Sequence, residues 1–429
     1  MVNNINSFKK RDLLGRLFAF LFIVSIGIGD FASIGPVKLS YITTILFLLY
    51  SFFIEKRQSI LRGNKARVFL FLITWLIYSA FQIIWAIDFQ LWISFYRSLF
   101  LNILIVGLII NYVENNDDWF FLSKSFMFLI LLCLLVGIWE YFTSQHIHYM
   151  NYSEMNSATV AILQNKPLSF YGNINDNSSV LFLGLFVSLI YFSSNKSNSL
   201  ITTMMRLLFC VLIIFEIFII DSRAIVFSLF LFAIVVFCFI ISSYFKPSNK
   251  KGILHARTLL FVLCVLFLLT VLFIHPFEYY LQFLSSGSDY QSDLFRINII
   301  KNCFNAFLQT GCLGLGPGQS IAVNGINVHS LYLEILFEYG IFIGGFVLLV
   351  FFKMYLDESK TDSRICDSII RSFPIVLLLA GVSSSKMFSL RAFWIAFAIV
   401  FIIKYRFFEN LSKSTSRYNL NYINIQYEN

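Results

Sequence analysis

The sequence predicts an all-α polytopic membrane protein with about twelve transmembrane helices, and three observations lead to this prediction. Of the 429 residues, 58% are hydrophobic and 13% are charged, whereas a soluble domain has roughly a quarter charged residues. The apolar residues form long runs, and a span needs about 20 of them because lipid cannot hydrogen-bond free backbone groups. These runs lack the alternation of polar and apolar residues that a membrane β-barrel requires.

Twelve apolar stretches separated by polar breaks are the predicted spans. They lie near residues 12–29, 34–54, 67–87, 93–113, 120–142, 177–194, 200–220, 224–244, 258–275, 328–352, 366–384 and 388–404. No small-residue cleavage site follows the first stretch, so we expect it to stay in the membrane as a helix. Residues 1–429 then form a single integral membrane domain.

The basic residues predict the orientation of the helices, because cytoplasmic loops carry an excess of Lys and Arg. With the amino terminus in the cytoplasm, 24 of the 32 Lys and Arg fall on the cytoplasmic side and eight on the outer side. Both termini are then cytoplasmic. The net charge of +9 follows from this topology, and we expect no nucleic-acid partner.

The two longest polar connections, residues 143–176 and 276–327, both fall on the outer side. Functional residues concentrate in such loops. Within the second loop, helical spacing predicts an amphipathic helix at the membrane interface, and its apolar face consists of Ile297, Ile300, Phe304, Phe307 and Leu308. The Gly-rich run 314–320 predicts a sharp turn after it. Cys303 and Cys312 both lie in this loop, where they either form a disulfide or remain free thiols.

Three ionisable residues on the predicted outer side are candidates for chemistry: Arg223, Arg296 and His329. Arg223 opens the eighth span, where an arginine at membrane depth costs about 2.5–3.5 kcal/mol and requires a partner or a purpose. The structural alternative is an ion pair with Asp221 or snorkelling to the headgroups. The structural alternative for Arg296 is contact with lipid phosphate. The structural alternative for His329 is a hydrogen bond at the start of a helix.

Together the three residues suit the transfer of a glycan from a lipid-linked pyrophosphate at the outer leaflet. Arginines can hold the departing pyrophosphate by bidentate contacts, and a neutral histidine can accept the proton of the attacking hydroxyl. The chain has no Asp-any-Asp motif for a divalent metal and no phosphate-binding loop for ATP. We therefore expect no metal and no cofactor, with arginine supplying the positive charge.

Several short elements follow one another along the predicted outer side: Phe170-Tyr171-Gly172-Asn173-Ile174-Asn175, Ser222-Arg223-Ala224, Arg296, Gly314-Leu315-Gly316-Pro317-Gly318, His329 and Glu338-Tyr339-Gly340-Ile341. In this order they resemble the O-antigen ligase and polymerase superfamily, the Wzy-type polysaccharide polymerases and WaaL-type ligases of the bacterial plasma membrane. The resemblance implies that Arg223 and Arg296 bind the lipid pyrophosphate and that His329 deprotonates the acceptor hydroxyl. It implies supporting roles for Asn173, Asn175, Gly316, Gly318, Tyr332 and Glu338. The family often has Asn after this histidine, whereas this chain has Ser330.

The resemblance favours a polymerase that transfers a growing glycan from undecaprenyl pyrophosphate to a lipid-linked repeat unit. Its implied partners are this lipid-linked oligosaccharide, membrane lipid and a chain-length regulator protein. Direct displacement by a hydroxyl would invert the anomeric centre. A ligase of the same superfamily, which moves finished glycan to a lipid, cell-wall or protein acceptor, is the first alternative. A transporter of lipid-linked oligosaccharide is the second, although most charges lie at span ends. A membrane scaffold without catalysis leaves the outer Arg, Arg and His unexplained.

Overall fold

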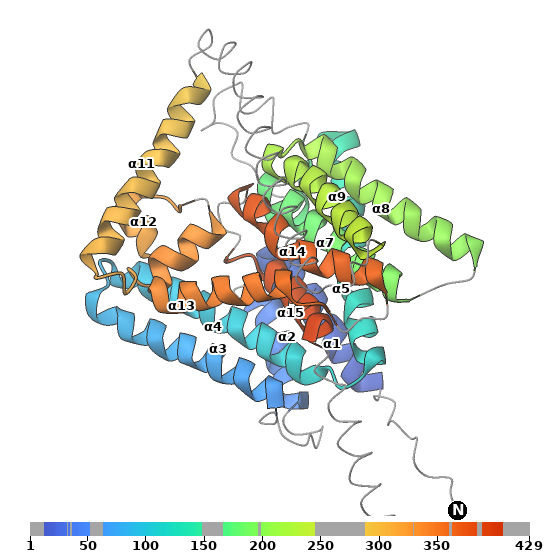
Figure 1. Ribbon diagram of the computed structural model, residues 1–429, viewed down its shortest axis with the longest axis horizontal. Coiled ribbons are helices and arrows are strands. Elements are labelled where there is room, and N and C mark those ends of the chain that lie inside the picture. The colour runs from blue at the N-terminus through green and yellow to red at the C-terminus, as the bar shows by residue number, and fades with distance from the viewer. Residues whose placement is uncertain are drawn as a thin grey trace, which may run out of the picture.

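The prediction of an all-α polytopic membrane protein is confirmed by the computed structural model (Figure 1). The structure describes residues 13–31, 33–34, 37–51, 63–147, 166–195, 199–244, 288–328, 330–359, 363–383 and 388–405. In this part of the chain the β structure is one short antiparallel pair, β1 (Ser33–Ile34) and β2 (Val37–Lys38).

The remaining elements are helices. In chain order they are α1 Leu13–Ile28, η1 Gly29–Phe31, α2 Leu39–Leu49, α3 Gly63–Phe81, η3 Gln82–Trp85, α4 Phe89–Tyr112, α5 Asn116–Thr143, η5 Ser169–Tyr171, α7 Ile174–Ser194, α8 Leu200–Ile220, α9 Arg223–Tyr244, α11 Ser288–Gln309, α12 Gln319–Asn324, α13 Leu331–Leu356, α14 Arg364–Ser383 and α15 Arg391–Tyr405.

Seven described helical segments are long and apolar enough to cross a membrane. They are Lys65–Trp85, Phe89–Tyr112, Asn116–Thr143, Ile174–Ser194, Leu200–Ile220, Arg223–Ile241 and Leu331–Leu356. The first two predicted spans are shorter apolar helices, and α2 begins only at Leu39 because the β pair precedes it. α14 and α15 correspond to the last two predicted spans. The span predicted at 258–275 lies outside the described residues.

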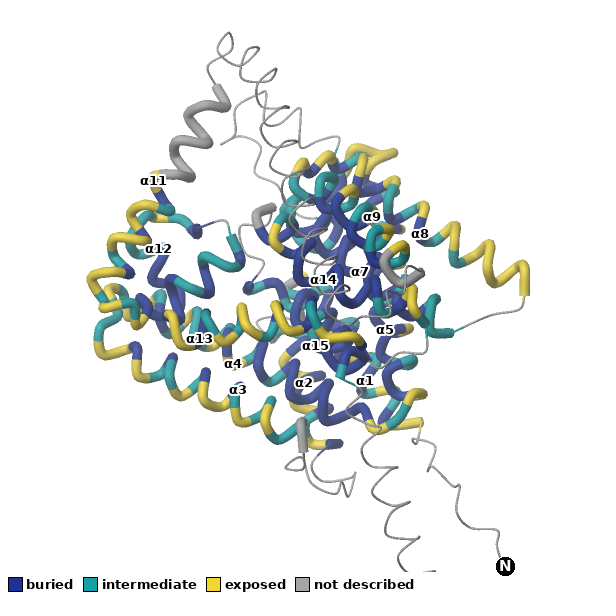
Figure 2. Tube along the Cα trace, in the orientation of Figure 1, coloured by how far each residue is buried: buried dark blue, intermediate teal, exposed yellow. Residues whose placement is uncertain are grey.

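The core forms around α7, α14 and α15, while α3 and α8 lie at the periphery (Figure 2). α14 packs against α7, α9 and α13, and α15 packs against α4 and α7. In the most apolar stretch of 18 residues of each span, 78% of the residues are buried in α7, compared with 22% in α3 and 28% in α8. The outer faces of α3 and α8 carry exposed aliphatic side chains such as Leu70 and Leu207. Lipid is the environment in which such faces are stable.

The helix predicted in the second outer loop is present as α11, but its buried face differs from the predicted one. Cys303 and Phe307 are buried against Phe337, whereas Phe304 and Leu308 are 46% and 50% exposed. Helical spacing alone does not distinguish an apolar side chain that packs on protein from one that faces outward. Cys303 and Cys312 are both free thiols.

Candidate functional site

Asn175 and Ser222 join the beginning of α7 to the turn between α8 and α9. The Ser222 hydroxyl donates a hydrogen bond to Asn175 Oδ1 at 3.0 Å. Asn173 precedes α7, and its Oδ1 accepts a hydrogen bond from the Asn175 backbone N–H at 2.8 Å, as an N-cap residue does. Two segments that the sequence marks as candidates therefore meet in one helix junction, although 47 residues separate the bonded pair.

Arg223 is the first residue of α9, directly after Ser222, and its side chain is exposed. Asp221 ends α8 in the left-handed conformation, with φ of 55°, and its carboxylate forms an ion pair with Lys166 at 3.4 Å. The predicted alternative for Arg223, a pairing with this aspartate, therefore competes with Lys166. The hydrogen bond of Ser222 to Asn175 holds the residue directly before Arg223 against the start of α7.

Buried polar groups on α5, α7 and α8 support the same junction, and the sequence did not predict them. Glu140 is 1% exposed, and its carboxylate accepts hydrogen bonds from the backbone N–H groups of Leu168 and Ser169, both at 2.7 Å. The Asn177 amide donates to Glu216 Oε1 at 3.3 Å, and both side chains are fully buried. A side chain at Gly137 of α5 would collide with Glu216 Oε1.

A sequence signal for Glu216 exists, because this glutamate lies in residues 207–220 of α8, which are otherwise apolar. An ionisable residue within a span is rare, and it marks a structural or functional site by default. The contact of Glu216 with Asn177 depends on how α7 and α8 pack against each other. The residue pattern of a single helix does not predict this packing.

The Gly-rich turn between α11 and α12 is held by the carboxylate of Glu338 on α13. Glu338 is fully buried; its Oε2 accepts a hydrogen bond from the Gly318 N–H at 2.8 Å, and its Oε1 accepts one from the Ser320 hydroxyl at 2.6 Å. Gly316 and Gly318 have φ of 102° and 73°, conformations that favour glycine. The predicted turn is therefore present, and Glu338 binds it directly.

α13 is broken at Gly340, and the Gly-rich turn uses the backbone groups that the break releases. Gly340 has φ of 77° and ψ of 174° within the helix. The Leu315 N–H donates to Phe337 O at 2.8 Å, the Gly316 N–H donates to Glu338 O at 2.8 Å, and the Ile341 N–H donates to Cys312 O at 3.0 Å. The span that was predicted as uninterrupted therefore consists of two helical segments. The N–H groups of the turn bind the carbonyl groups next to the break, which would otherwise lack partners in lipid.

The C-terminal end of α3 and the following η3 helix hold this turn from the other side. The Tyr78 hydroxyl donates to Leu313 O at 2.6 Å, and the Trp85 indole N–H donates to Gly314 O at 2.8 Å. The Gln82 amide donates to Glu338 O at 2.9 Å and to Leu313 O at 3.2 Å. These three residues were not predicted, because their partners lie more than 200 residues away in the sequence.

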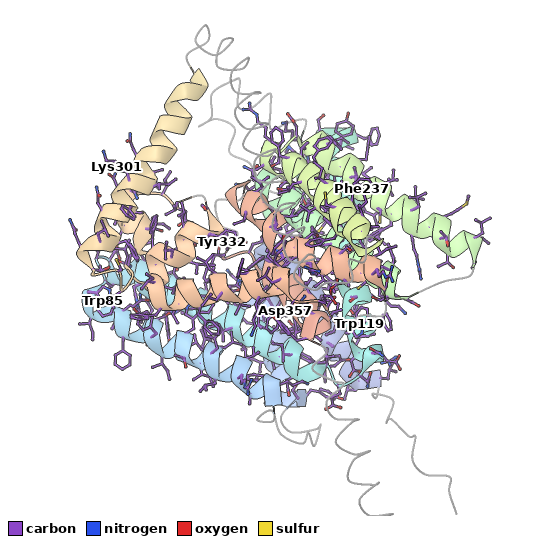
Figure 3. The ribbon with its side chains drawn as sticks, in the orientation of Figure 1. Trp85, Trp119, Phe237, Lys301, Tyr332 and Asp357 are labelled. Carbon is purple, nitrogen blue, oxygen red and sulfur yellow. The ribbon has the colours of Figure 1, made fainter. Side chains whose placement is uncertain are left out.

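Tyr332, labelled in Figure 3, connects α13 to α14. Its hydroxyl donates to Pro374 O at 3.1 Å, so its observed contact is structural. Glu334 follows on the same helix, is 3% exposed, and within the described part of the chain its Oε1 has no hydrogen-bond partner.

Arg296 lies on α11, and the helix that carries it packs through Cys303 and Phe307. The Asn324 amide of α12 donates to Cys303 Sγ at 3.0 Å. Burial raises the pKa of the Cys303 thiol to about 11, and the Asn324 hydrogen bond acts in the opposite direction. His329 lies outside the described residues.

The predicted residues thus form two groups in the structure. Asn173, Asn175 and Arg223 share the junction of α7, α8 and α9, whereas Gly316, Gly318 and Glu338 share the turn against α13. α14 packs against both α9 and α13, so it connects helices of the two groups.

Comparison with protein families gives a match to part of the chain. Residues 208–350 match the family model described as O-Antigen ligase. The matched segment runs from α8 into α13 and includes Arg223, Arg296, the Gly-rich turn, His329 and Glu338. Comparisons with curated proteins and with solved structures give no match. The family match over residues 208–350 confirms the predicted resemblance to the O-antigen ligase and polymerase superfamily.

Proposed function

We propose that the chain is a polysaccharide polymerase, which transfers a growing glycan from undecaprenyl pyrophosphate to a lipid-linked repeat unit on the outer face of the bacterial plasma membrane. The observation that carries this proposal is the family match over residues 208–350, because that one segment contains Arg223, Arg296 and His329. The charge distribution supports an orientation with both termini in the cytoplasm. A chain-length regulator protein is the partner expected for such a polymerase.

The proposed reaction is a single displacement. The acceptor hydroxyl oxygen forms a bond to the anomeric carbon of the donor glycan, and the bond from that carbon to the pyrophosphate oxygen breaks. His329 takes the hydroxyl proton as general base. Arg223 and Arg296 hold the departing undecaprenyl pyrophosphate, whose negative charge grows as the bond breaks. Because one displacement occurs, the anomeric centre inverts.

The junction at Asn175 supports the role of Arg223. A residue that stabilises a transition state acts best when its position is fixed before the reaction. The hydrogen bond between Ser222 and Asn175, and the N-cap of α7 at Asn173, fix the backbone from which Arg223 extends. Metal-independent catalysis follows from this proposal, because guanidinium groups supply the charge that a divalent ion supplies in other glycosyltransferases.

A ligase is the second candidate, and the description of the matching family model as O-Antigen ligase favours it. Both enzymes use the same donor chemistry and differ in the acceptor.

Deletion of the gene separates these functions through the lipid-linked glycan that accumulates. Single repeat units on the outer leaflet are the result expected for a polymerase. Full-length polymer that remains lipid-linked would instead establish the ligase, and repeat units retained on the inner leaflet would establish a transporter. Purified protein with lipid-linked repeat units should form polymer in the presence of EDTA; loss of polymer under this condition would contradict metal-independent transfer.

A further inference from the structure

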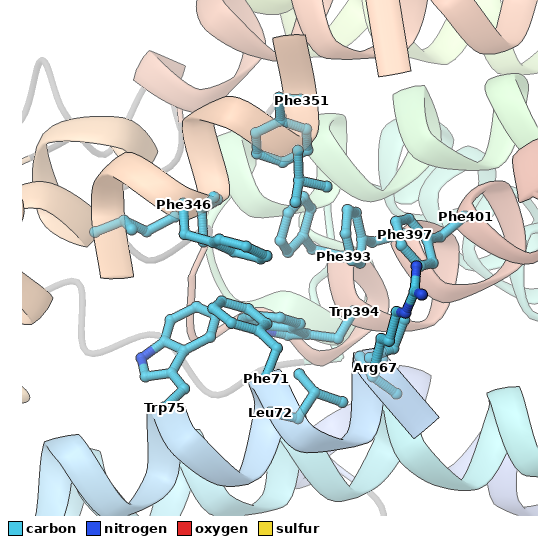
Figure 4. A pocket seen from close by; sticks show the side chains of 15 residues that line it. Arg67, Phe71, Leu72, Trp75, Phe346, Phe351, Phe393, Trp394, Phe397 and Phe401 are labelled. Carbon is cyan, nitrogen blue, oxygen red and sulfur yellow. The ribbon is translucent and has the colours of Figure 1, made fainter. Parts of the chain in front are cut away.

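An apolar cavity of about 160 Å³ lies between α3, α13 and α15 (Figure 4). Its walls include Phe71 of α3, Phe346 of α13 and Phe397 of α15. Arg67, near the beginning of α3, is the one charged residue among the described residues that line it. The cavity between these three helices is therefore apolar except for one cation near the beginning of α3.

α3 packs along α4, and hydrogen bonds also attach it to the rest of the protein at its two ends. At its outer end, Tyr78 binds the Gly-rich turn through Leu313 O. At its other end, the Lys65 ammonium group donates a hydrogen bond to Val113 O at 2.7 Å. Between these points the rings of Phe71 and Phe346 stack with centroids 4.2 Å apart. α3 is a peripheral helix, with 22% of its apolar window buried, so the cavity lies where lipid surrounds the protein.

The residues of α3 that line the cavity cover a length similar to that of one leaflet of a bilayer. Arg67 and Trp75, which both line it, are eight residues apart on α3, which corresponds to about 12 Å along a helix. Half of a bilayer hydrocarbon core is about 15 Å. Arg67 is at the end of α3 opposite to the Gly-rich turn, so the cavity lies in the leaflet opposite to the candidate site.

Arg67 has an exposed side chain, and within the described residues it has no hydrogen-bond, ion-pair or ring partner. A guanidinium group at the edge of the hydrocarbon region is stable when an anion or water compensates it. Phosphate is a preferred partner, because the planar guanidinium group binds two of its oxygens at once. Basic groups next to clefts between membrane helices are typical binding sites for anionic headgroups on the cytoplasmic side.

We propose that this cavity binds one anionic phospholipid of the cytoplasmic leaflet, with an acyl chain packed against Phe397 and the stacked rings of Phe71 and Phe346, and with the phosphate at Arg67. The bound lipid fills the space between α3 and the pair α13 and α15. It thereby holds α3 in the position from which Tyr78 and Gln82 bind the Gly-rich turn. This site is separate from the one that would bind the glycan donor in the outer leaflet.

Native mass spectrometry of the purified full-length protein tests the headgroup. Dioleoylphosphatidylglycerol should bind as one molecule per chain about tenfold more tightly than dioleoylphosphatidylcholine, because the anionic headgroup gains a charge-assisted contact. Arg67→Gln should remove this difference. Lys124→Gln, which removes an exposed cation predicted on the same side, should leave it unchanged. Equal affinities for the two lipids, or an unchanged preference in Arg67→Gln, would overturn the proposal.

A second pair of variants tests the cavity itself. Val350→Trp places a large ring in the cavity and should abolish retention of phosphatidylglycerol. Leu349→Trp adds the same ring on a neighbouring residue that is 65% exposed, and retention should persist. If Val350→Trp does not fold, the Arg67→Gln result decides alone. Undecaprenyl phosphate that displaces equimolar phosphatidylglycerol would assign the cavity to a polyprenyl lipid and overturn the phospholipid proposal. Because the readout is lipid binding, it is independent of whether the protein polymerises glycan.

Discussion

Glu338 and Gly318 form the contact on which the Gly-rich turn depends. The Gly318 N–H donates a hydrogen bond to Glu338 Oε2 at 2.8 Å, and both groups are buried. The same carboxylate accepts the Ser320 hydroxyl, so one side chain of α13 satisfies two donors of the turn. Glu338 therefore acts as a positioning residue for the turn, beyond any contact with substrate.

Removal of the Glu338 carboxylate should destabilise the turn. In Glu338→Ala the Gly318 N–H loses its acceptor inside the protein, and a buried donor without a partner costs about 1–3 kcal/mol. Thermal unfolding of the detergent-purified protein should show a lower midpoint than in the wild-type protein. The double variant with Ser320→Ala serves as the control, because both changes remove the hydrogen bond between Ser320 and Glu338. Fully additive effects of the two substitutions would argue against the hydrogen bond between Ser320 and Glu338.

The helix break at Gly340 should not tolerate alanine. Gly340 has φ of 77°, a backbone conformation that L residues with a side chain rarely adopt. In addition, a Cβ at this position would collide with the Leu313 carbonyl. We expect Gly340→Ala to lower the stability by about 1–3 kcal/mol or more. Gly345→Ala is the matched control in the same helix, because an added Cβ there meets no atom within 4 Å. Equal stability of the two variants in thermal unfolding would show that α13 is continuous.

The spans could be predicted from the sequence because the physical requirement is local. A run such as residues 200–220 must satisfy its own backbone in lipid, and this requirement is visible in the apolar residues themselves. The same locality explains why the break at Gly340 was missed. Residues 328–352 form one apolar run, and its interruption depends on the turn at Leu313–Gly316, which supplies the hydrogen bonds.

The candidate site was predicted in part. The sequence marks Asn175 and Ser222-Arg223 separately, and the structure joins them through one hydrogen bond. Glu338 was predicted only as a supporting residue, because its contact with Gly318 crosses 20 residues and requires the broken helix. Gln82 and Glu140 were missed, because each binds backbone groups of a distant segment, and a backbone partner leaves no residue pattern to detect.

The hydrogen bond between Ser222 and Asn175 should affect transfer through Arg223. Ser222→Ala and Asn175→Ala each remove this bond, and we expect a rate reduction of about fivefold, which corresponds to about 1 kcal/mol. The double variant should be no slower than either single variant, because both remove the same contact. Ser228→Ala is the control, since Ser228 of α9 bonds only locally to Ala224 O at 2.6 Å. The measurement is the initial rate of polymer formation at equal membrane levels, and a rate at the level of Ser228→Ala would contradict the coupling.

Cys303 should react slowly with thiol reagents. Burial raises its pKa from 9.0 to about 11, so the reactive thiolate is about a hundredfold scarcer at pH 8 than in an unperturbed thiol. In a variant with Cys303 as its single cysteine, N-ethylmaleimide labelling should be slow at pH 8 and should accelerate as the pH rises toward 11. The comparison is a single-cysteine variant that retains Cys312, whose side chain is partly exposed. Faster labelling of Cys303 than of Cys312 at pH 8 would exclude the buried position of this thiol on α11.

Three substitutions test the proposed transfer directly. Arg223→Ala and Arg296→Ala each remove a charge that the proposal places on the leaving pyrophosphate, and a loss of about 10²–10³-fold in rate is expected. His329→Ala removes the proposed general base, with an expected loss of about 10²–10⁴-fold. Lys301→Ala is the matched control, because Lys301 is an exposed cation on α11, the helix that carries Arg296. Polymer length and amount are measured with lipid-linked repeat units at equal membrane levels of each variant. Retention of wild-type synthesis in any one of the three would remove that residue from the proposed reaction, and a loss as large in Lys301→Ala would show that charge on α11 matters without regard to position.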